Sequence, residues 1–287
     1  MIYVSTFLNG VTLASYLFIL ALGLNLSFGL LRIVNLSHGA FYLVGGYIGW
    51  NAFQITGSWW LSFVIAGVFI ALIAFLQEFV LLRRARGKST METLITLSVA
   101  VILADMAIWI WEGVPRRIPM PDFVRGAPFM ISGMPFPRSS LFTILLAVII
   151  GIVFWVVLRK TKIGMIIRAG VDNFEIVASL GINVRVLFTC MFAVAGFMAG
   201  IAGMVGATFQ MISPGEDMRI IVYTLLVMIL GGMGSFEGSI LGALIIGLAF
   251  SFGSLIAPHF GTFFIFAPVA LILVFRPQGL LGKVANI

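Results

Sequence analysis

The chain has 287 residues, of which 61% are hydrophobic and only 9% are charged, and its mean hydropathy is +1.18. Soluble domains carry about 25% charged residues, so this composition excludes a soluble enzyme, a secreted disulfide scaffold and a nucleic-acid-binding domain. The net charge of +7 indicates membrane topology rather than a nucleic-acid partner. The chain is therefore predicted to be an all-α integral membrane protein that crosses the lipid bilayer several times.

Nine apolar segments follow one another along the chain, and most have the roughly 20 residues that a spanning helix needs. Two of them are interrupted: 33–53 contains Asn35, His38 and the pair Gly45-Gly46, and a glycine hinge at 231–235 divides 218–257. We expect residues 1–287 to form one transmembrane domain, a helical bundle of about eight to nine spans, some of them discontinuous. The segments lie at 6–31, 33–53, 59–82, 91–111, 140–158, 186–212, 218–233, 237–257 and 260–276.

Glycines at these interruptions allow two interpretations. Broken helices at membrane depth often lie beside a substrate path, whereas two small residues four positions apart bring neighbouring helices into close contact. For any single glycine we favour packing over a role in a path. Pairs with the packing spacing are Gly45/Gly49, Gly196/Gly200 and Gly238/Gly242.

The distribution of lysine and arginine predicts the orientation of the chain. With the N-terminus outside, twelve of the 17 basic residues fall on one side of the membrane and five on the other. The richer side is cytoplasmic, which places the N-terminus out and the C-terminus in. Residues 112–139, with six of the ten prolines, then form an external Pro-rich loop that cannot hold a long helix. Residues 159–185 form a cytoplasmic loop that is basic at its start and helical.

No constellation for catalysis or metal binding is visible in the sequence. The two histidines, His38 and His259, lie on different segments, and with a single cysteine they provide no metal set. The run Gly87-Lys88-Ser89-Thr90 matches only the end of a phosphate-binding loop, because Leu82 stands where the first glycine is required. We therefore predict a non-catalytic chain that binds no cofactor itself, so that any ATP and magnesium would be bound by another chain.

Polar residues within apolar segments are candidate functional residues, because burying them in lipid is costly. Asn25, Asn35 and His38 cluster near the first hairpin, and Asp105 lies about midway along its segment. Asp105 could be a proton relay or a solute ligand, but for one isolated acid we favour an interhelical hydrogen bond.

A short capped helix is predicted within the cytoplasmic loop. Asp172 can cap its start by accepting from the amide of Glu175, and Gly181 suits the left-handed position that ends a helix. The intervening helix of about eight residues is far too short to span a membrane, and Phe174, Val177 and Ala178 share one of its faces. Docking into a partner's groove and a merely structural loop are both left open.

Several blocks of the sequence occur in an order known from one transporter family, and together they cover most of the chain. They are Asn9-Gly10-Val-Thr-Leu, Gly23-Leu-Asn-Leu-Ser-Phe-Gly29, Asn35-Leu-Ser-His38-Gly39-Ala-Phe-Tyr-Leu-Val-Gly45, Arg168-Ala169-Gly-Val-Asp172, Ala178-Ser-Leu-Gly181-Ile182, Ser213-Pro214, Gly231-Gly232-Met-Gly234-Ser235 and Arg276-Pro277-Gln-Gly279-Leu280. Through these blocks the sequence resembles the permease subunits of branched-chain amino-acid ABC importers, the LivH type. It departs from the common pattern in Ser37, where many members have alanine, and in the acidic pair Glu216-Asp217.

This resemblance implies a permease subunit of an ATP-driven importer for branched-chain or related amino acids. The implied partners are a second permease subunit, either LivM-like or another copy of this chain, two cytoplasmic ATPase subunits and an external solute-binding protein. The implied location is the bacterial cytoplasmic (inner) membrane. The alternative is a proton-coupled secondary transporter or a channel for a small solute, which would need more intramembrane charge than Asp105 provides.

With the resemblance, the candidate site residues divide into two sets, and neither is expected to ligate a metal. The first set would couple the chain to its ATPases: Arg168, Ala169, Asp172, Phe174, Glu175, Ala178 and Gly181. The second set would line or adjoin the translocation path: Asn25, Asn35, His38, Gly39, Asp105, Gly231, Gly232 and Gly234.

Overall fold

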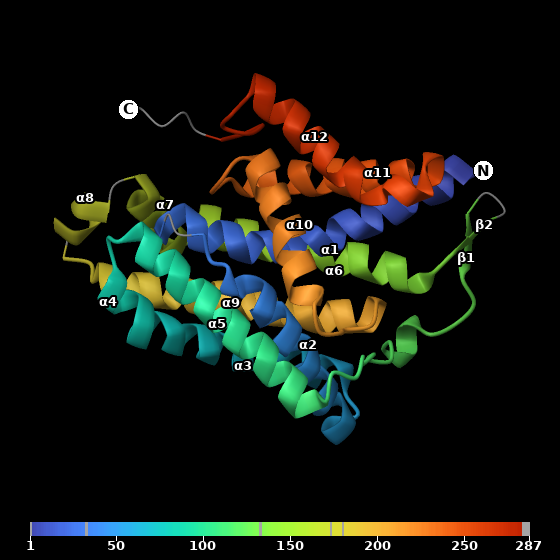
Figure 1. Cartoon of the computed structure of the whole chain (residues 1–287), viewed down its shortest axis with the longest axis horizontal. Coiled ribbons are helices and arrows are strands. Elements are labelled where there is room, and N and C mark those ends of the chain that lie inside the picture. Colours follow the sequence, from blue (N-terminus) through green and yellow to red (C-terminus); the bar gives the residue numbers. More distant parts are fainter. Residues whose placement is uncertain (1, 32–33, 132–133, 173, 180, 283–287) are drawn as a thin grey trace. The chain divides into compact units, whose positions relative to one another are not determined.

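The computed structural model describes residues 2–31, 34–131, 134–172, 174–179 and 181–282, most of which are helical (Figure 1). The elements in chain order are α1 (Ile2–Leu31), α2 (Ser37–Thr56), α3 (Trp59–Leu76), the π-helical segment η1 (Gln77–Leu82), α4 (Arg83–Ala85), α5 (Ser89–Trp111), the 3-10 turn η2 (Asp122–Val124), β1 (Phe129–Ile131), β2 (Met134–Phe136), α6 (Arg138–Lys160), α7 (Lys162–Asp172), α8 (Phe174–Ser179), α9 (Val184–Phe209), α10 (Glu216–Gly231), α11 (Phe236–Ile256), the 3-10 turn η3 (Pro258–Phe260) and α12 (Gly261–Phe275).

Within the described residues, seven helices are long and apolar enough to cross a membrane. They are Ile2–Phe28, Trp59–Ala85, Ser89–Trp111, Arg138–Lys160, Val184–Phe209, Phe236–Ile256 and Pro258–Phe275. This confirms an all-α, multi-pass membrane protein. The other two predicted segments are helical but fall short of that measure, because α2 carries many small and polar residues and α10 has only 16 residues. The count of eight to nine spans and the orientation stay predictions.

The two interrupted segments differ from one another in the structure. Residues 218–257 form two helices, α10 and α11, and the chain turns between them where Gly232 and Gly234 have φ of 103° and 80°. The predicted hinge is therefore confirmed. In the segment 33–53, by contrast, α2 runs unbroken from Ser37 through Gly45 and Gly46, so the interruption expected at that glycine pair is wrong.

Short sequence signals set several helix ends. Gly57, with φ of 63°, ends α2 and donates its N–H to Phe53 O at 2.9 Å. Ser58 follows at once and caps α3 by accepting from Leu61 N at 3.4 Å. A tight turn between two helices requires a residue that tolerates the left-handed conformation and then a residue that caps the next helix. Gly57 and Ser58 meet these two requirements.

The chain divides into two compact units, with boundaries within α1, α6 and α10 and, between residues 118 and 119, in the loop after α5. Unit 2 holds residues 26–118 and 151–221, and its core consists of α2, α3, α5 and α9 packed side by side (Figure 1). Glycines permit this close packing: a Cβ on Gly45 would lie 2.6 Å from the Cα of Gly200 across the α2–α9 contact. Gly196 packs against the Ile70 carbonyl of α3, where a Cβ would lie 3.0 Å away.

Unit 1 holds residues 1–25, 119–150 and 222–287. Here α1 packs on α11, and a Cβ on Gly247 would lie 2.5 Å from the carbonyl oxygen of Gly10. Gly238 faces the backbone of Gly231, and Gly242 faces that of Val227. The packing interpretation is thus confirmed for the predicted small-residue pairs.

The two long loops also have local structure. In the described part of 112–139, the structure contains one 3-10 turn and the β1–β2 hairpin, with no longer helix, as the prolines predict. The hairpin itself was not predicted. In 159–185 most of the described residues are helical, but they form α7 and α8 rather than one short helix.

Candidate functional site

The predicted coupling helix corresponds to α8, which has six residues rather than about eight. Its end matches the prediction, because Gly181 has φ of 79° and donates its N–H to Ala178 O at 3.0 Å. Its start differs: Asp172 is the last residue of α7, and the side chains of Asp172, Phe174 and Glu175 lie outside the described residues. The predicted cap at Asp172 therefore stays a prediction.

The described side chains around α8 show how this loop is anchored. Arg168, Ala169 and Ala178 are exposed, whereas Val177 is buried. After α8, Asn183 caps α9 by accepting from Arg185 N at 3.1 Å and Val186 N at 3.3 Å. The loop thus ends at a capped helix, α9, which belongs to the core of unit 2.

In unit 1, the path candidate Asn25 joins α1 to the break between α10 and α11. Its Oδ1 accepts from Gly234 N at 3.0 Å, and its Nδ2 donates to Ser239 Oγ. Asn25 is buried, so both ends of its amide serve to hold the break in place.

Gly231 and Gly232 lie in the same break, but they are closely packed. The chain after α12 forms hydrogen bonds with the end of α10: Leu280 N donates to Leu230 O at 2.9 Å and Leu281 N to Gly231 O at 3.0 Å. A Cβ on Gly232 would lie 2.7 Å from the Cα of Gly282. Backbone groups freed by a broken helix must be satisfied by protein or by water, and here protein satisfies them.

In unit 2, Asn35 lies two residues before α2 and His38 lies in the first turn of α2. Both residues are fully buried. Ser37 N donates to Asn35 Oδ1 at 3.1 Å, and the Ser37 hydroxyl lies 2.5 Å from Asn35 Oδ1 and 3.0 Å from Gln77 Oε1. The buried side-chain nitrogens of Asn35 and Gln77 have no hydrogen-bond partner within the described structure. Gly39 packs against the backbone of Asp217, which leaves no room for a side chain.

Asp105 is separate from both clusters. It is exposed on α5 and makes no hydrogen bond or ion pair with the part of the chain that the structure describes. The interhelical hydrogen bond that we favoured for it is therefore absent within these residues. The structure does not bring Asp105 together with Asn35 and His38.

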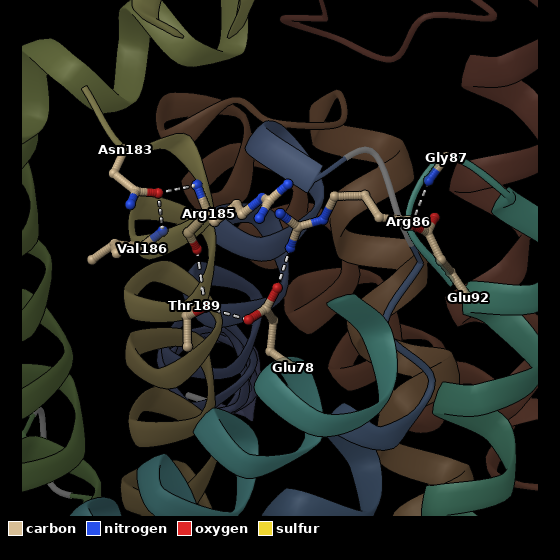
Figure 2. Close-up of polar contacts among 8 residues, drawn as sticks. All are labelled: Glu78, Arg86, Gly87, Glu92, Asn183, Arg185, Val186 and Thr189. Atoms are coloured by element: carbon tan, nitrogen blue, oxygen red, sulfur yellow. Dashed lines mark hydrogen bonds and ion pairs between the residues drawn. The ribbon is translucent and has the colours of Figure 1, made fainter. Parts of the chain in front are cut away.

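The sequence analysis missed a buried ionic cluster centred on Glu78 in η1. Figure 2 shows the Glu78 carboxylate between Thr189 of α9, whose hydroxyl donates to Oε2, and Arg86, whose guanidinium pairs with Oε1. Glu78 is only 1% exposed. These donors offset the cost of burying a carboxylate this deeply.

Arg86 connects this carboxylate to two further groups. Its guanidinium stacks over the Phe188 ring at 4.3 Å, a cation–π contact. Burial lowers the pKa of the Arg86 side chain below its ordinary value, and the carboxylates of Glu78 and Glu92 oppose that shift. Glu92 accepts from Gly87 N at 3.1 Å and fixes the turn before α5 (Figure 2).

The signal for this cluster was present in the sequence. Glu78 is a charged residue near the end of an apolar run, but Arg83 stands only five positions later. On that spacing alone, the side chain would be expected to reach the membrane surface. Nor do the described residues contain a group of three or more histidine, cysteine, aspartate or glutamate side chains that could hold a metal.

Comparison with known proteins gives one family. Residues 6–274 match the family described as branched-chain amino acid transport system / permease component. The high-affinity branched-chain amino acid transport system permease protein BraD of Pseudomonas aeruginosa is 25% identical over 98% of this chain and 96% of its own length. LivH of Escherichia coli K12 is 27% identical, covering 96% and 94%. A probable LivH of Methanocaldococcus jannaschii is 26% identical, covering 94% and 89%. No solved structure matches.

Proposed function

The chain belongs to the family of permease components of branched-chain amino acid transport systems, and on that basis we propose that it is the pore-forming subunit of an ATP-driven importer. The family match carries this proposal, because it reaches all seven span candidates in the described residues and includes the α7–α8 loop. The solute would be a branched-chain or chemically related amino acid, since the relatives are permeases for branched-chain amino acids.

Coupling to separate ATPase subunits would occur at the loop that carries α8. A helix of six residues cannot span a membrane, and a short helix with one buried and one exposed side suits insertion into a partner's groove. Val177 is buried and Ala178 is exposed, so these two residues, predicted to share one face with Phe174, differ in exposure. The proposed coupling residues are Arg168, Ala169, Asp172, Phe174, Glu175, Ala178 and Gly181.

ATP and magnesium would be bound by those ATPase subunits and not by this chain. A phosphate-binding loop connects a buried strand to a helix. Residues 87–90 instead lie in the turn between α4 and the start of α5. The permease would then contribute conformational change rather than covalent chemistry.

The translocation path would be formed with a second permease subunit, LivM-like or another copy, in the bacterial cytoplasmic membrane. An external solute-binding protein would deliver the amino acid. Within unit 2, the polar candidates are Asn35, just before α2, and His38, in the first turn of α2. Interruptions of transporter helices often lie beside solute paths. The other path candidates are Asn25, Gly39, Asp105, Gly231, Gly232 and Gly234.

The proposal is tested by purifying the tagged chain from its native membrane in mild detergent and identifying the proteins that accompany it. The purified assembly is then reconstituted in vesicles, and uptake of radiolabelled leucine, isoleucine and valine is measured with and without ATP. We expect an ATPase and a second permease to co-purify, and uptake to require ATP.

The opposite outcome is equally specific. A chain that purifies alone, with uptake that continues without ATP and collapses when the proton gradient is dissipated, would show a secondary transporter. Asp105 would then be the first residue to substitute.

A further inference from the structure

Two neighbouring polar residues at the start of η1 contact two different helices. Gln77 and Glu78 are 4% and 1% exposed. Gln77 Oε1 lies 3.0 Å from the hydroxyl of Ser37, the first residue of α2, while Glu78 accepts from Thr189 of α9. The side chains of adjacent helix residues point in different directions. Gln77 and Glu78 therefore connect the start of α2 to the start of α9.

The α9 end of this connection lies close to the α8 loop. Asn183 caps α9, and Thr189 follows Val184 by five residues, which is about 7.5 Å along the helix. The Thr189 hydroxyl also lies 3.0 Å from Arg185 O, within the first turns. A displacement of α8 therefore moves the group that holds the Glu78 carboxylate.

The Glu78 carboxylate is connected to α9 through two donors. Thr189 contacts this carboxylate directly, and Arg86 pairs with it (Figure 2). The Arg86 guanidinium also stacks on Phe188, which lies on the same helix as Thr189. A buried carboxylate that lost either donor would become an uncompensated charge at low dielectric. A movement of α9 would therefore displace this carboxylate or break these contacts.

The α2 end of this connection has a second hydrogen-bonding arrangement available. The side-chain nitrogens of Gln77 and Asn35 are buried, and neither has a partner within the described residues. Rotating the Gln77 amide by half a turn would allow Nε2 to donate to Ser37 Oγ in place of the present contact. Coupling between sites needs an element with two discrete arrangements, and π-helical segments recur at functional sites.

We propose that η1 is the link by which movement of the α8 loop reaches the start of α2, with Glu78 as its positioning residue. The link consists of Ser37, Gln77, Glu78, Arg86 and Thr189. The proposal rests on the proposed function, because it needs an ATPase that acts on the α8 loop. These five residues would transmit movement of the α8 loop to the helices of unit 2.

The test is Thr189→Val, which keeps the side-chain shape and removes the hydroxyl that binds Glu78. Its matched control is Thr208→Val in the same helix. Thr208 is also buried, and its hydroxyl accepts from Trp59 Nε1 at 3.1 Å, so it contacts none of the residues of the link. The measurement is leucine taken up per ATP hydrolysed by the whole reconstituted importer. We expect Thr189→Val to lower this ratio by about tenfold, within the range of mutations along coupling networks. Thr189→Ser should restore it, and Thr208→Val should leave it unchanged.

A second variant, Gln77→Leu, tests the α2 end and remains informative if Thr189→Val fails to accumulate in the membrane. It should lower the same ratio while ATP hydrolysis continues. A general loss of folding would reduce uptake and hydrolysis together and leave their ratio unchanged. If the Thr189→Val ratio equals that of Thr208→Val, or if Gln77→Leu stays coupled, the link is overturned. Absence of ATP-driven uptake in the unmodified importer would instead overturn the proposed function.

Discussion

The contact between α2 and α9 gives a stability prediction whose size follows from the structure. A Cβ added to Gly45 would lie 2.6 Å from Cα and 2.8 Å from the carbonyl oxygen of Gly200, whereas ordinary contact begins at 3.4 Å. Gly45→Ala must therefore separate the two backbones by about 0.8 Å, the difference between 3.4 and 2.6 Å. Gly200 cannot recede freely, because α3 packs on it and its own Cβ position lies 2.6 Å from Ala66 O.

Gly49→Ala on the same helix is the matched control. Its Cβ would lie 2.7 Å from Met204 Cγ, so the overlap is almost equal, but the neighbour is a side chain. Methionine has three rotatable bonds and adapts to such changes. Both substitutions gain the same helix propensity, about 0.5–1 kcal/mol, so this gain cancels when the two variants are compared.

We expect Gly45→Ala to be less stable than Gly49→Ala by about 1–3 kcal/mol, the usual cost of overpacking. Each kcal/mol corresponds to roughly 2–4 °C in melting temperature for a chain of this size. Thermal unfolding of the detergent-purified protein, followed by the fluorescence of its six tryptophans, measures the difference. Equal melting temperatures, or a lower one for Gly49→Ala, would refute the inferred backbone contact between α2 and α9.

Two further predictions concern the candidate sites. Gly181→Val places a β-branched residue at φ of 79°, which costs about 1–3 kcal/mol of backbone strain. This variant should reduce ATP-coupled leucine uptake while the amount of chain in the membrane stays normal. Unchanged uptake would remove Gly181 from the proposed coupling residues. Asp105→Asn should leave ATP-driven uptake near the unmodified level, because Asp105 has no partner among the described residues. Loss of uptake in this variant, together with uptake that depends on the proton gradient, would favour a proton-coupled carrier.

Features encoded by local sequence were predictable. The hydropathy of each segment predicted the helices, and two glycines that adopt positive φ identified the turn between α10 and α11. The glycine pairs predicted close helix contacts because their spacing sets which face of a helix is flat. In each case the relevant residues lie within a few positions of one another.

The Glu78 cluster could not be predicted in the same way. Its partner Thr189 is 111 positions away, and Gln77 contacts Ser37 across 40 positions. The basic residue that pairs with Glu78 is Arg86, eight positions along the chain. The structure starts α8 at Phe174, and the capping role of Asp172 stays a prediction, because its side chain lies outside the described residues.

The path candidates are no longer equivalent once their hydrogen bonds are known. Asn25 uses both ends of its amide to hold a helix break, so binding a solute would require releasing Gly234 or Ser239. Asn35 uses only its oxygen, and its buried nitrogen has no partner within the described structure. Because leaving a buried donor unsatisfied costs free energy, a polar ligand or a rearrangement that satisfies it is favoured. Among the asparagines proposed for the path, this argues for Asn35, which lies next to the residue that η1 contacts.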